Sequence, residues 1–409
     1  MSAMSRQLPR WSDLRPLLRM QPMALSATDR RLAAAANIAD LRAIARRRTP
    51  RSVFDYVDGA AEGEISLARA REAFRRVEFH PQVLQDVSDV DTSTTILGRP
   101  AALPLILAPT GFTRMMHHEG ESAVASVAAR SGLPYALSTM GTTTVEDVSD
   151  ASPAGDLWFQ LYVMRDRGPA RDLIARASSS GYTTLILTVD TAVGGARLRD
   201  VRNGLTIPPS LRLKTLGDMS LHPAWWFNVL TTEPLEFASM RSTGGTVADM
   251  IDRLFDPAVT YDDIDWLRGQ WSGSLVVKGI QSVGDAVQAV EHGADAIVLS
   301  NHGGRQLDRA PTPLELLPRV LDAVDGRAEV YVDTGVTSGA DILAAVGLGA
   351  NAVMAGRAYL YGLMAGGERG VQRAVELLTA EFRRTQQLLG VGSLAELGPE
   401  QVTLRGSAE

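Results

Sequence analysis

The stretch Ala296-Ile-Val-Leu-Ser-Asn-His-Gly-Gly-Arg-Gln-Leu-Asp308 joins a short apolar run to a polar, glycine-bearing segment. Its first four residues predict a buried strand. The helical pattern before it has Ser282 as the expected N-cap and Gly293 just past its end. Proteins that alternate strands and helices carry reactive groups at the C-terminal ends of buried parallel strands. We therefore expect His302 and Arg305 to belong to a functional site.

Length and composition limit the classes of protein to consider. A chain of 409 residues can form one large barrel or two to three smaller domains. A net charge of −6 argues against a nucleic-acid surface. The chain has no cysteine, which excludes disulfides and thiolate metal sites. Since it also lacks a signal-peptide core and any apolar run of roughly 18 residues, we expect a cytoplasmic protein.

Apolar strand candidates recur from about residue 103 onward, with helical patterns between most of them. The candidates are 103–109, 134–139, 157–163, 183–189, 274–278, 296–300, 328–333 and 352–355. The clearest helical patterns are 119–130, 167–178, 284–292 and 340–348. Eight such alternations are typical of a (β/α)8 TIM barrel, and a doubly wound open sheet is the alternative.

The barrel is expected to lie in one domain, residues 37–409, behind an N-terminal arm at 1–36. Residues 37–76 look helical, with a helix beginning at Thr49-Pro50 that contains Tyr56. The arm carries arginines at 6, 10, 15 and 19, and either packs on the body or a neighbouring subunit, or contacts an anionic membrane surface.

A long loop, about residues 191–273, interrupts the alternation of strands and helices after the fourth strand. Loops of this length inside a compact domain are usually functional. It contains Trp225-Trp226-Phe227, which could lie on a membrane interface or against a quinone-bearing partner. The three aromatic residues could equally fill a local core or a subunit contact.

Polar residues follow the strand candidates at what would be the same end of the barrel. Asp190 and His302 suit a base that a carboxylate orients. Arg305, Arg197 and Tyr56 suit the carboxylate of a substrate. These residues predict a site for a small acid that loses a proton.

Other strand ends suit a cofactor with a polar ring and a phosphate. The residues that match the edge of a heteroaromatic ring are Ser138, Gln160, Thr188 and Lys278. Those after strands seven and eight, where barrels commonly bind phosphate, are Asp333, Gly335, Gly356 and Arg357. Lys278 would neutralise the negative charge of a reduced flavin, unless its role is a structural salt bridge. Together these groups predict a flavin mononucleotide (FMN) enzyme.

Ser300-Asn-His-Gly-Gly-Arg-Gln306 resembles the active-site signature of the FMN-dependent α-hydroxy acid oxidases and dehydrogenases. The resemblance runs from about residue 37 to the C-terminus. Its other motifs are Ala108-Pro-Thr-Gly111, Phe159-Gln-Leu-Tyr162, Thr188-Val-Asp190, Gly195-Ala-Arg197, Val277-Lys-Gly279 and Gly356-Arg357. Within the family, residues 194–204 and 356–366 are most similar to the actinobacterial respiratory L-lactate dehydrogenases.

The resemblance implies a role for each matching residue. His302 would be the base and Asp190 its partner, and Tyr162 would contact the substrate hydroxyl. Arg305 and Tyr56 would hold the substrate carboxylate with help from Arg197. The flavin would be lined by Pro109, Thr110, Ser138, Gln160, Thr188, Lys278 and Ser300.

Four positions depart from the family pattern, one of them Thr334, where the family usually has glycine. Met140 stands in the substrate pocket where glycolate oxidase has a tryptophan, and Gly111 stands in the cofactor site where several oxidases have alanine. Thr337 replaces a phosphate-binding arginine, which would leave Arg357 and backbone amides to hold the phosphate.

The resemblance implies oxidation of an L-2-hydroxy acid, with L-lactate to pyruvate as the first choice. Electrons would pass to a quinone-type acceptor, with peripheral contact to the inner face of the cell membrane, and the protein would be a homo-oligomer, a tetramer or octamer. One alternative is an oxidase that reduces oxygen to hydrogen peroxide. Others are a non-catalytic flavin-binding barrel and a flavoprotein isomerase, in which the carboxylate clamp would be idle.

Two motifs are expected to be decoys. Gly347-Leu-Gly-Ala-Asn-Ala352 resembles a dinucleotide fingerprint, but it ends a helix and precedes a strand, the reverse of the required order. His117-His118-Glu119 could suggest a metal, but it lies at a helix start where capping would explain Glu119. We therefore expect no metal site.

Overall fold

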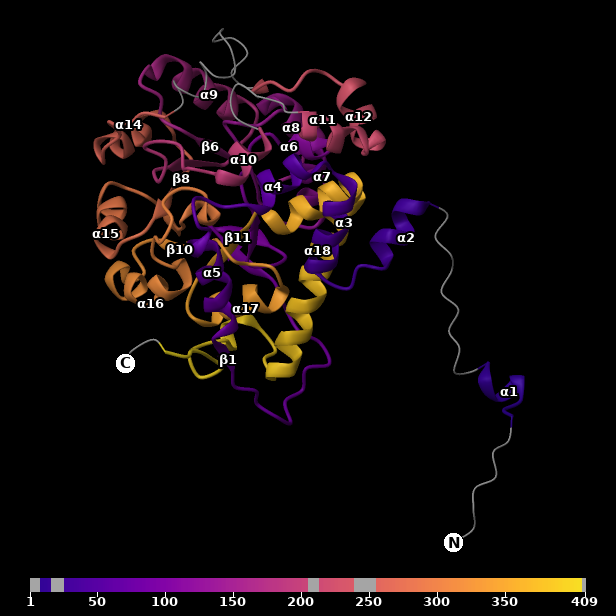
Figure 1. Ribbon diagram of the computed structural model, residues 1–409. Coiled ribbons are helices and arrows are strands. Elements are labelled where there is room, and N and C mark those ends of the chain that lie inside the picture. Colours follow the sequence, from indigo (N-terminus) through magenta and orange to yellow (C-terminus); the bar gives the residue numbers. More distant parts are fainter. Residues whose placement is uncertain (1–7, 16–25, 205–212, 239–254, 407–409) are drawn as a thin grey trace.

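Eight parallel strands close into a barrel that helices surround (Figure 1). The computed structural model describes residues 8–15, 26–204, 213–238 and 255–406. The barrel strands are β4 (Leu105–Leu107), β5 (Tyr135–Ser138), β6 (Leu157–Leu161), β7 (Thr184–Thr188), β8 (Ser274–Ile280), β9 (Ala296–Leu299), β10 (Glu329–Val332) and β11 (Ala352–Ala355). Because β11 pairs with β4, the sheet has no edge, and the predicted eight-stranded barrel is confirmed over an open sheet.

The interior of the barrel is a packed core. Alternate strand residues form one buried cluster, in which the large rings of Trp158 and Tyr331 are offset by alanines such as Ala136 and Ala352. The two rings lie 6.2 Å apart between centroids. A short hairpin, β2 (Thr94–Ile96) and β3 (Arg99–Ala101), adds its apolar residues to this cluster. The core leaves the C-terminal ends of the strands as the place for a site.

Helices between the strands cover the outside of the barrel. They are α7 (Gly120–Arg130), α8 (Val145–Ala151), α9 (Arg167–Ser179), α14 (Asp262–Gln270), α15 (Val283–Glu291), α16 (Pro313–Val324), α17 (Gly339–Gly347) and α18 (Arg357–Leu389). The predicted start of α15 is confirmed, since Ser282 Oγ accepts a hydrogen bond from the backbone N–H of Asp285. Gly293 follows that helix at φ +92°, which glycine adopts without strain.

The N-terminal residues form short helices, and all but the first, which stands apart in Figure 1, lie against the rest of the chain. These are α1 (Trp11–Leu14), α2 (Ala27–Ala33), α3 (Ile38–Arg48), α4 (Arg51–Asp58) and α5 (Ile65–Arg75), followed by β1 (Val77–Phe79) and, further on, α6 (Thr113–Met116). Helices α2 and α3 lie against α18. β1 pairs with the C-terminal strand β12 (Val402–Leu404). Of the arm's arginines, positions 6 and 19 lie outside the described residues.

The long segment after β7 contains more helix than the sequence predicted. It holds α10 (Leu198–Asn203), α11 (Leu213–Ser220), α12 (Pro223–Leu230) and α14. Trp225 is buried and its Nε1 donates to the carbonyl of Met115, whereas Phe227 is 68% exposed. The aromatic segment is therefore divided between a local core and the surface. Within the described residues, no helix combines the length and apolarity that crossing a membrane requires.

Candidate active site

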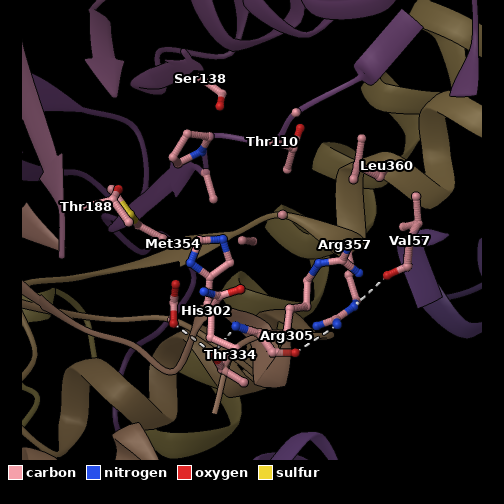
Figure 2. A pocket seen from close by; sticks show the side chains of 18 of the residues that line it. Val57, Thr110, Ser138, Thr188, His302, Arg305, Thr334, Met354, Arg357 and Leu360 are labelled. Atoms are coloured by element: carbon pink, nitrogen blue, oxygen red, sulfur yellow. Dashed lines mark hydrogen bonds between the residues drawn. The ribbon is translucent and has the colours of Figure 1, made fainter. Parts of the chain in front are cut away.

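One cavity at the C-terminal end of the barrel collects nearly all of the predicted site residues. Its predicted lining residues are Tyr56, Pro109, Thr110, Gly111, Ser138, Met140, Gln160, Tyr162, Thr188, Arg197, Lys278, His302, Arg305, Asp333, Gly335, Gly356 and Arg357. In Figure 2, His302, Arg305 and Arg357 lie next to one another in this space. Asp190 and Ser300 lie behind the lining, where each holds a residue that reaches the cavity.

His302 is held from behind by a buried carboxylate. Its Nδ1 lies 2.9 Å from Asp190 Oδ1, and the Asp190 side chain is 1% exposed. The backbone of His302 has φ +58°, and its N–H donates to Ser300 Oγ at 3.0 Å. Burial alone would raise the pKa of Asp190, but His302 and Lys278 together lower it. An ionised Asp190 fixes the imidazole and leaves Nε2 free to take a proton.

Lys278 is buried and is neutralised by a carboxylate that lies two strands away in the barrel. Its Nζ lies 2.7 Å from Asp333 Oδ2 and donates to Ser300 Oγ at 2.8 Å. Burial would lower the pKa of Lys278, but Asp333 and Asp190 raise it above its ordinary value. The carboxylate comes from the end of β10, so the absence of an acidic residue in β8 did not exclude a salt bridge.

Gln160 has a buried donor that the protein leaves without a partner. Its Oε1 accepts a hydrogen bond from Ser138 Oγ at 3.0 Å, while no partner is found for Nε2 among the described residues. A buried unsatisfied amide donor costs free energy unless a ligand accepts from it. Gln160 Nε2 therefore points to an acceptor atom on a bound group.

Two guanidinium groups flank the ring of Tyr56. Arg305 lies 4.9 Å and Arg197 5.9 Å from the ring centroid. Arg305 donates to the carbonyls of Tyr56 and Gly59, yet no carboxylate forms an ion pair with either arginine in the described part of the chain. Burial, followed by the charge of Arg197, lowers the pKa of Arg305 to about 10. Two such cations favour the binding of an anion.

Arg357 and Asp333, both predicted to face a phosphate, mainly contact the protein. Arg357 donates from Nε to the carbonyl of Val57, and from Nη2 to those of Gly59 and Gly303, each at 2.8 Å (Figure 2). Asp333 pairs with Lys278. Both residues still line the cavity: the charge of Asp333 is paired there, whereas Arg357 keeps its charge but is held in place by backbone carbonyls.

The sequence did not point to several residues that also line the cavity. Among them are Leu67 and Arg71 from α5, and Phe255 from the long segment. A spacing of four residues puts Leu67 and Arg71 on one face of the predicted helix, but no pattern indicated that this face meets the barrel mouth.

The candidate metal cluster is compact, but the reason given for Glu119 is wrong. The ligand atoms of His117, His118 and Glu119 lie within 4.8 Å of one another. Burial lowers the pKa of His117 to about 4. Glu119 makes no capping bond in α7, and instead its carboxylate accepts from the N–H of Glu368 just after the bend in α18.

Comparison with known proteins assigns the family. The model of the FMN-dependent dehydrogenase family matches residues 45–404. The chain belongs to this family. It is 54% identical to the "Putative L-lactate dehydrogenase" of Mycobacterium tuberculosis, over 98% of this chain and 97% of that protein. It is 43% identical to the L-lactate dehydrogenase of Caulobacter vibrioides, over 88% and 95% of the two chains.

The structural comparison agrees with the family. The crystal structure of the monotopic membrane protein (S)-mandelate dehydrogenase superimposes with a TM-score of 0.87 at 37% identity. The match covers 91% of this chain and all of that one (100%). The protein is therefore an FMN-dependent oxidoreductase with the (β/α)8 barrel of its family.

The cavity fits the cofactor that the family implies. Gln160 Nε2 offers the unpaired donor that a polar ring edge needs, and buried Lys278 offers a positive charge beside it. Gly335 lines the other end at φ +101°. Gln160, Lys278, Ser138 and Thr188 would hold the ring of FMN, and the end with Gly335 and Gly356 would hold its phosphate.

Proposed function

We propose that this protein oxidises L-lactate to pyruvate, with His302 as the base and a quinone as the acceptor of the electrons. The observation that carries the proposal is the pair of guanidinium groups, Arg305 and Arg197, which have no carboxylate partner in the described chain and share a cavity with the His302–Asp190 pair. Such a site favours a substrate that has a carboxylate next to the carbon that reacts.

Each residue would have a separate task. Arg305 and Arg197 would hold the carboxylate and so fix the α-carbon, which lowers the entropic part of the barrier. His302 would take one proton from the substrate at Nε2, and Asp190 would stabilise the resulting imidazolium. Burial raises the pKa of Tyr162, so its phenol stays protonated and can donate to the substrate hydroxyl oxygen. FMN, when bound, would supply the redox chemistry by taking up the two electrons and the second hydrogen that the substrate loses.

The walls near these groups favour a small acid. Phe255 packs edge-on against Tyr162 at 5.6 Å between centroids, and Met140 also lines the cavity. The two relatives above are named for L-lactate and the structural neighbour for (S)-mandelate. We favour L-lactate because the sequence identity to the first two is higher.

The experiment is anaerobic mixing of the purified yellow protein with one acid at a time. We expect L-lactate to bleach the flavin absorbance fully, D-lactate to leave it unchanged, and (S)-mandelate to act more slowly. If (S)-mandelate bleaches the flavin faster than L-lactate, the substrate assignment is wrong. If no acid bleaches it, the protein is a flavin-binding barrel without this activity.

The acceptor is tested by reoxidation of the reduced protein. We expect a soluble quinone to restore the yellow colour at the rate of turnover, and air to restore it much more slowly. Solved mandelate oxidases are among the structural neighbours, so the oxidase alternative has a specific precedent. Reoxidation by air at the full rate of turnover, with hydrogen peroxide as product, would establish that alternative.

We further propose that α11 and α12 bring the enzyme to the membrane that holds the quinone. The two helices lie side by side, and the exposed apolar residues of these helices and of the turn between them are Leu213, Leu216, Leu221, Phe227 and Leu230. An exposed apolar cluster of this kind favours insertion into a membrane interface. Phe227→Ser with Leu230→Ser should reduce co-sedimentation with phosphatidylglycerol vesicles. The exposed pair Val83 and Leu84, changed in the same way, should not.

A further inference from the structure

We propose that Arg71 of α5 binds the phosphate of FMN and supplies, together with Arg357, the second positive charge that Thr337 does not provide. The inference rests on FMN as the cofactor, and it is independent of which acid or acceptor the enzyme uses.

Arg71 reaches the cavity from outside the barrel. Leu67 and Arg71 lie one turn apart on α5, and both line the cavity. The helix packs tightly on the turn after β10, because a Cβ added at Gly335 would come within 3.0 Å of the carbonyl oxygen of Ala70. This contact puts α5 beside the end of the cavity formed by Gly335 and Val336.

Arg71 is half-buried, yet it has no hydrogen-bond or ion-pair partner in the described part of the chain. Arg69 of the same helix is exposed, and the next two arginines of this segment are paired. Arg75 pairs with Glu72, and Arg76 pairs with Glu315. A partly desolvated guanidinium at a cavity wall, without a carboxylate, favours a ligand anion.

The other candidates for holding the phosphate are already engaged. Arg357 uses Nε and Nη2 on three backbone carbonyls. The backbone N–H and the hydroxyl of Thr337 both donate to Asp341, which caps α17. The carboxylate of Asp333 pairs with Lys278. A phosphate dianion at this end therefore has backbone amides but needs a further cation.

The charge of Arg71 acts on Arg357, which lines the same cavity. Burial is the main cause that lowers the pKa of Arg357, and the charge of Arg71 lowers it further. An anion between the two guanidinium groups would remove this repulsion, which is the arrangement expected at a phosphate site.

The test compares the release of two flavins that differ only in the phosphate. The holoprotein is diluted, and the release of FMN is followed by the rise of flavin fluorescence. The same protein is then loaded with riboflavin by exchange and diluted again. We expect Arg71→Gln to weaken retention of FMN by about 10- to 100-fold, the range for a lost charged hydrogen bond, and to leave riboflavin unchanged. Arg71→Lys should be intermediate.

Arg69→Gln is the matched control, because Arg69 lies on the same helix but is exposed. It changes the net charge equally and should leave both flavins unaffected. The proposal is overturned if Arg71→Gln releases FMN no faster than this control. It is also overturned if riboflavin is lost to the same degree as FMN, since Arg71 would then support the fold rather than the phosphate.

Discussion

Lys278 and Arg305 are two cations at the same end of the barrel, and they differ in whether a carboxylate of the protein pairs with them. Lys278 is buried against Asp333 at 2.7 Å, and its pKa is raised although burial alone would lower it. Among the described residues, Arg305 has only backbone carbonyls as acceptors, and burial lowers its pKa to about 10. The neutralised cation can support an uncharged ring, whereas the unpaired cation is suited to a ligand that brings a negative charge.

The two cations also differ in their effect on stability. Folding lowers the pKa of Arg305, so its charged form opposes folding at every pH below about 10. A bound carboxylate would reverse this effect. Folding raises the pKa of Lys278, so its charged form stabilises the folded protein at neutral pH, and this contribution is lost only in strong alkali. The charge of Arg305 at the substrate end of the cavity therefore destabilises the fold, whereas the charge of Lys278 at the flavin end stabilises it.

The largest loss of activity is expected when His302 is replaced, because this residue is ion-paired on one side and open to the substrate on the other. Asp190 pairs with one side of its ring, and the other side faces the cavity. His302→Ala removes the base and should lower kcat for L-lactate by about a thousandfold or more, the usual contribution of a general base. The visible spectrum of bound FMN should stay intact. If turnover falls less than tenfold in a variant that still holds FMN, His302 is not the base.

Lys278→Met tests how much the ion pair of Lys278 with Asp333 contributes to stability. The change leaves Asp333 buried without a partner, and breaking a buried ion pair in this way costs about 3–5 kcal/mol. We expect a lower urea midpoint with and without added FMN. The double variant Lys278→Met with Asp333→Asn should recover most of this loss, since no buried charge is left alone. Equal midpoints for the single variant and the parent would show that the pair is energetically neutral.

Arg305→Met tests whether the unpaired guanidinium serves substrate binding rather than stability. The variant loses the charged hydrogen bonds to the substrate carboxylate, so kcat/KM should fall about a hundredfold. Its free energy of unfolding should not decrease, because the side chain that is removed has no carboxylate partner. Arg309→Met is the matched control, as Arg309 is exposed nearby. If the Arg305→Met variant is strongly destabilised and keeps its kcat/KM, Arg305 supports the fold and does not bind the substrate.

The fold was predictable from the sequence because each barrel strand is buried on both faces. Apolar runs such as those at 157–161 and 184–188 recur with helical patterns between them. The pairing of β1 with β12 was not predictable, since these three-residue strands lie at opposite ends of the domain and show no distinctive pattern.

The site was predictable in part for a related reason. Parallel strands in a barrel bring their C-terminal ends together, so polar residues such as Gln160 and His302 had to share one face. The partner of Lys278 could not be read in this way, because Asp333 reaches it across β9 and the contact depends on register. Arg71 was missed because the packing of α5 on the barrel mouth leaves no local pattern.

The smallest effect expected is a shift in pH dependence, which separates His302 from the cations around it. Asp190 has a pKa below its ordinary value and stays ionised in mild acid. On acidification from about pH 8 to pH 5, kcat/KM should therefore fall through loss of the proposed base, and not through protonation of Asp190. Asp190→Asn should move this acid limb to lower pH, because a neighbouring carboxylate favours the protonated form of a base. A flat profile over this range would show that the imidazole does not take the proton, and an unmoved limb in the variant would show that Asp190 does not tune it.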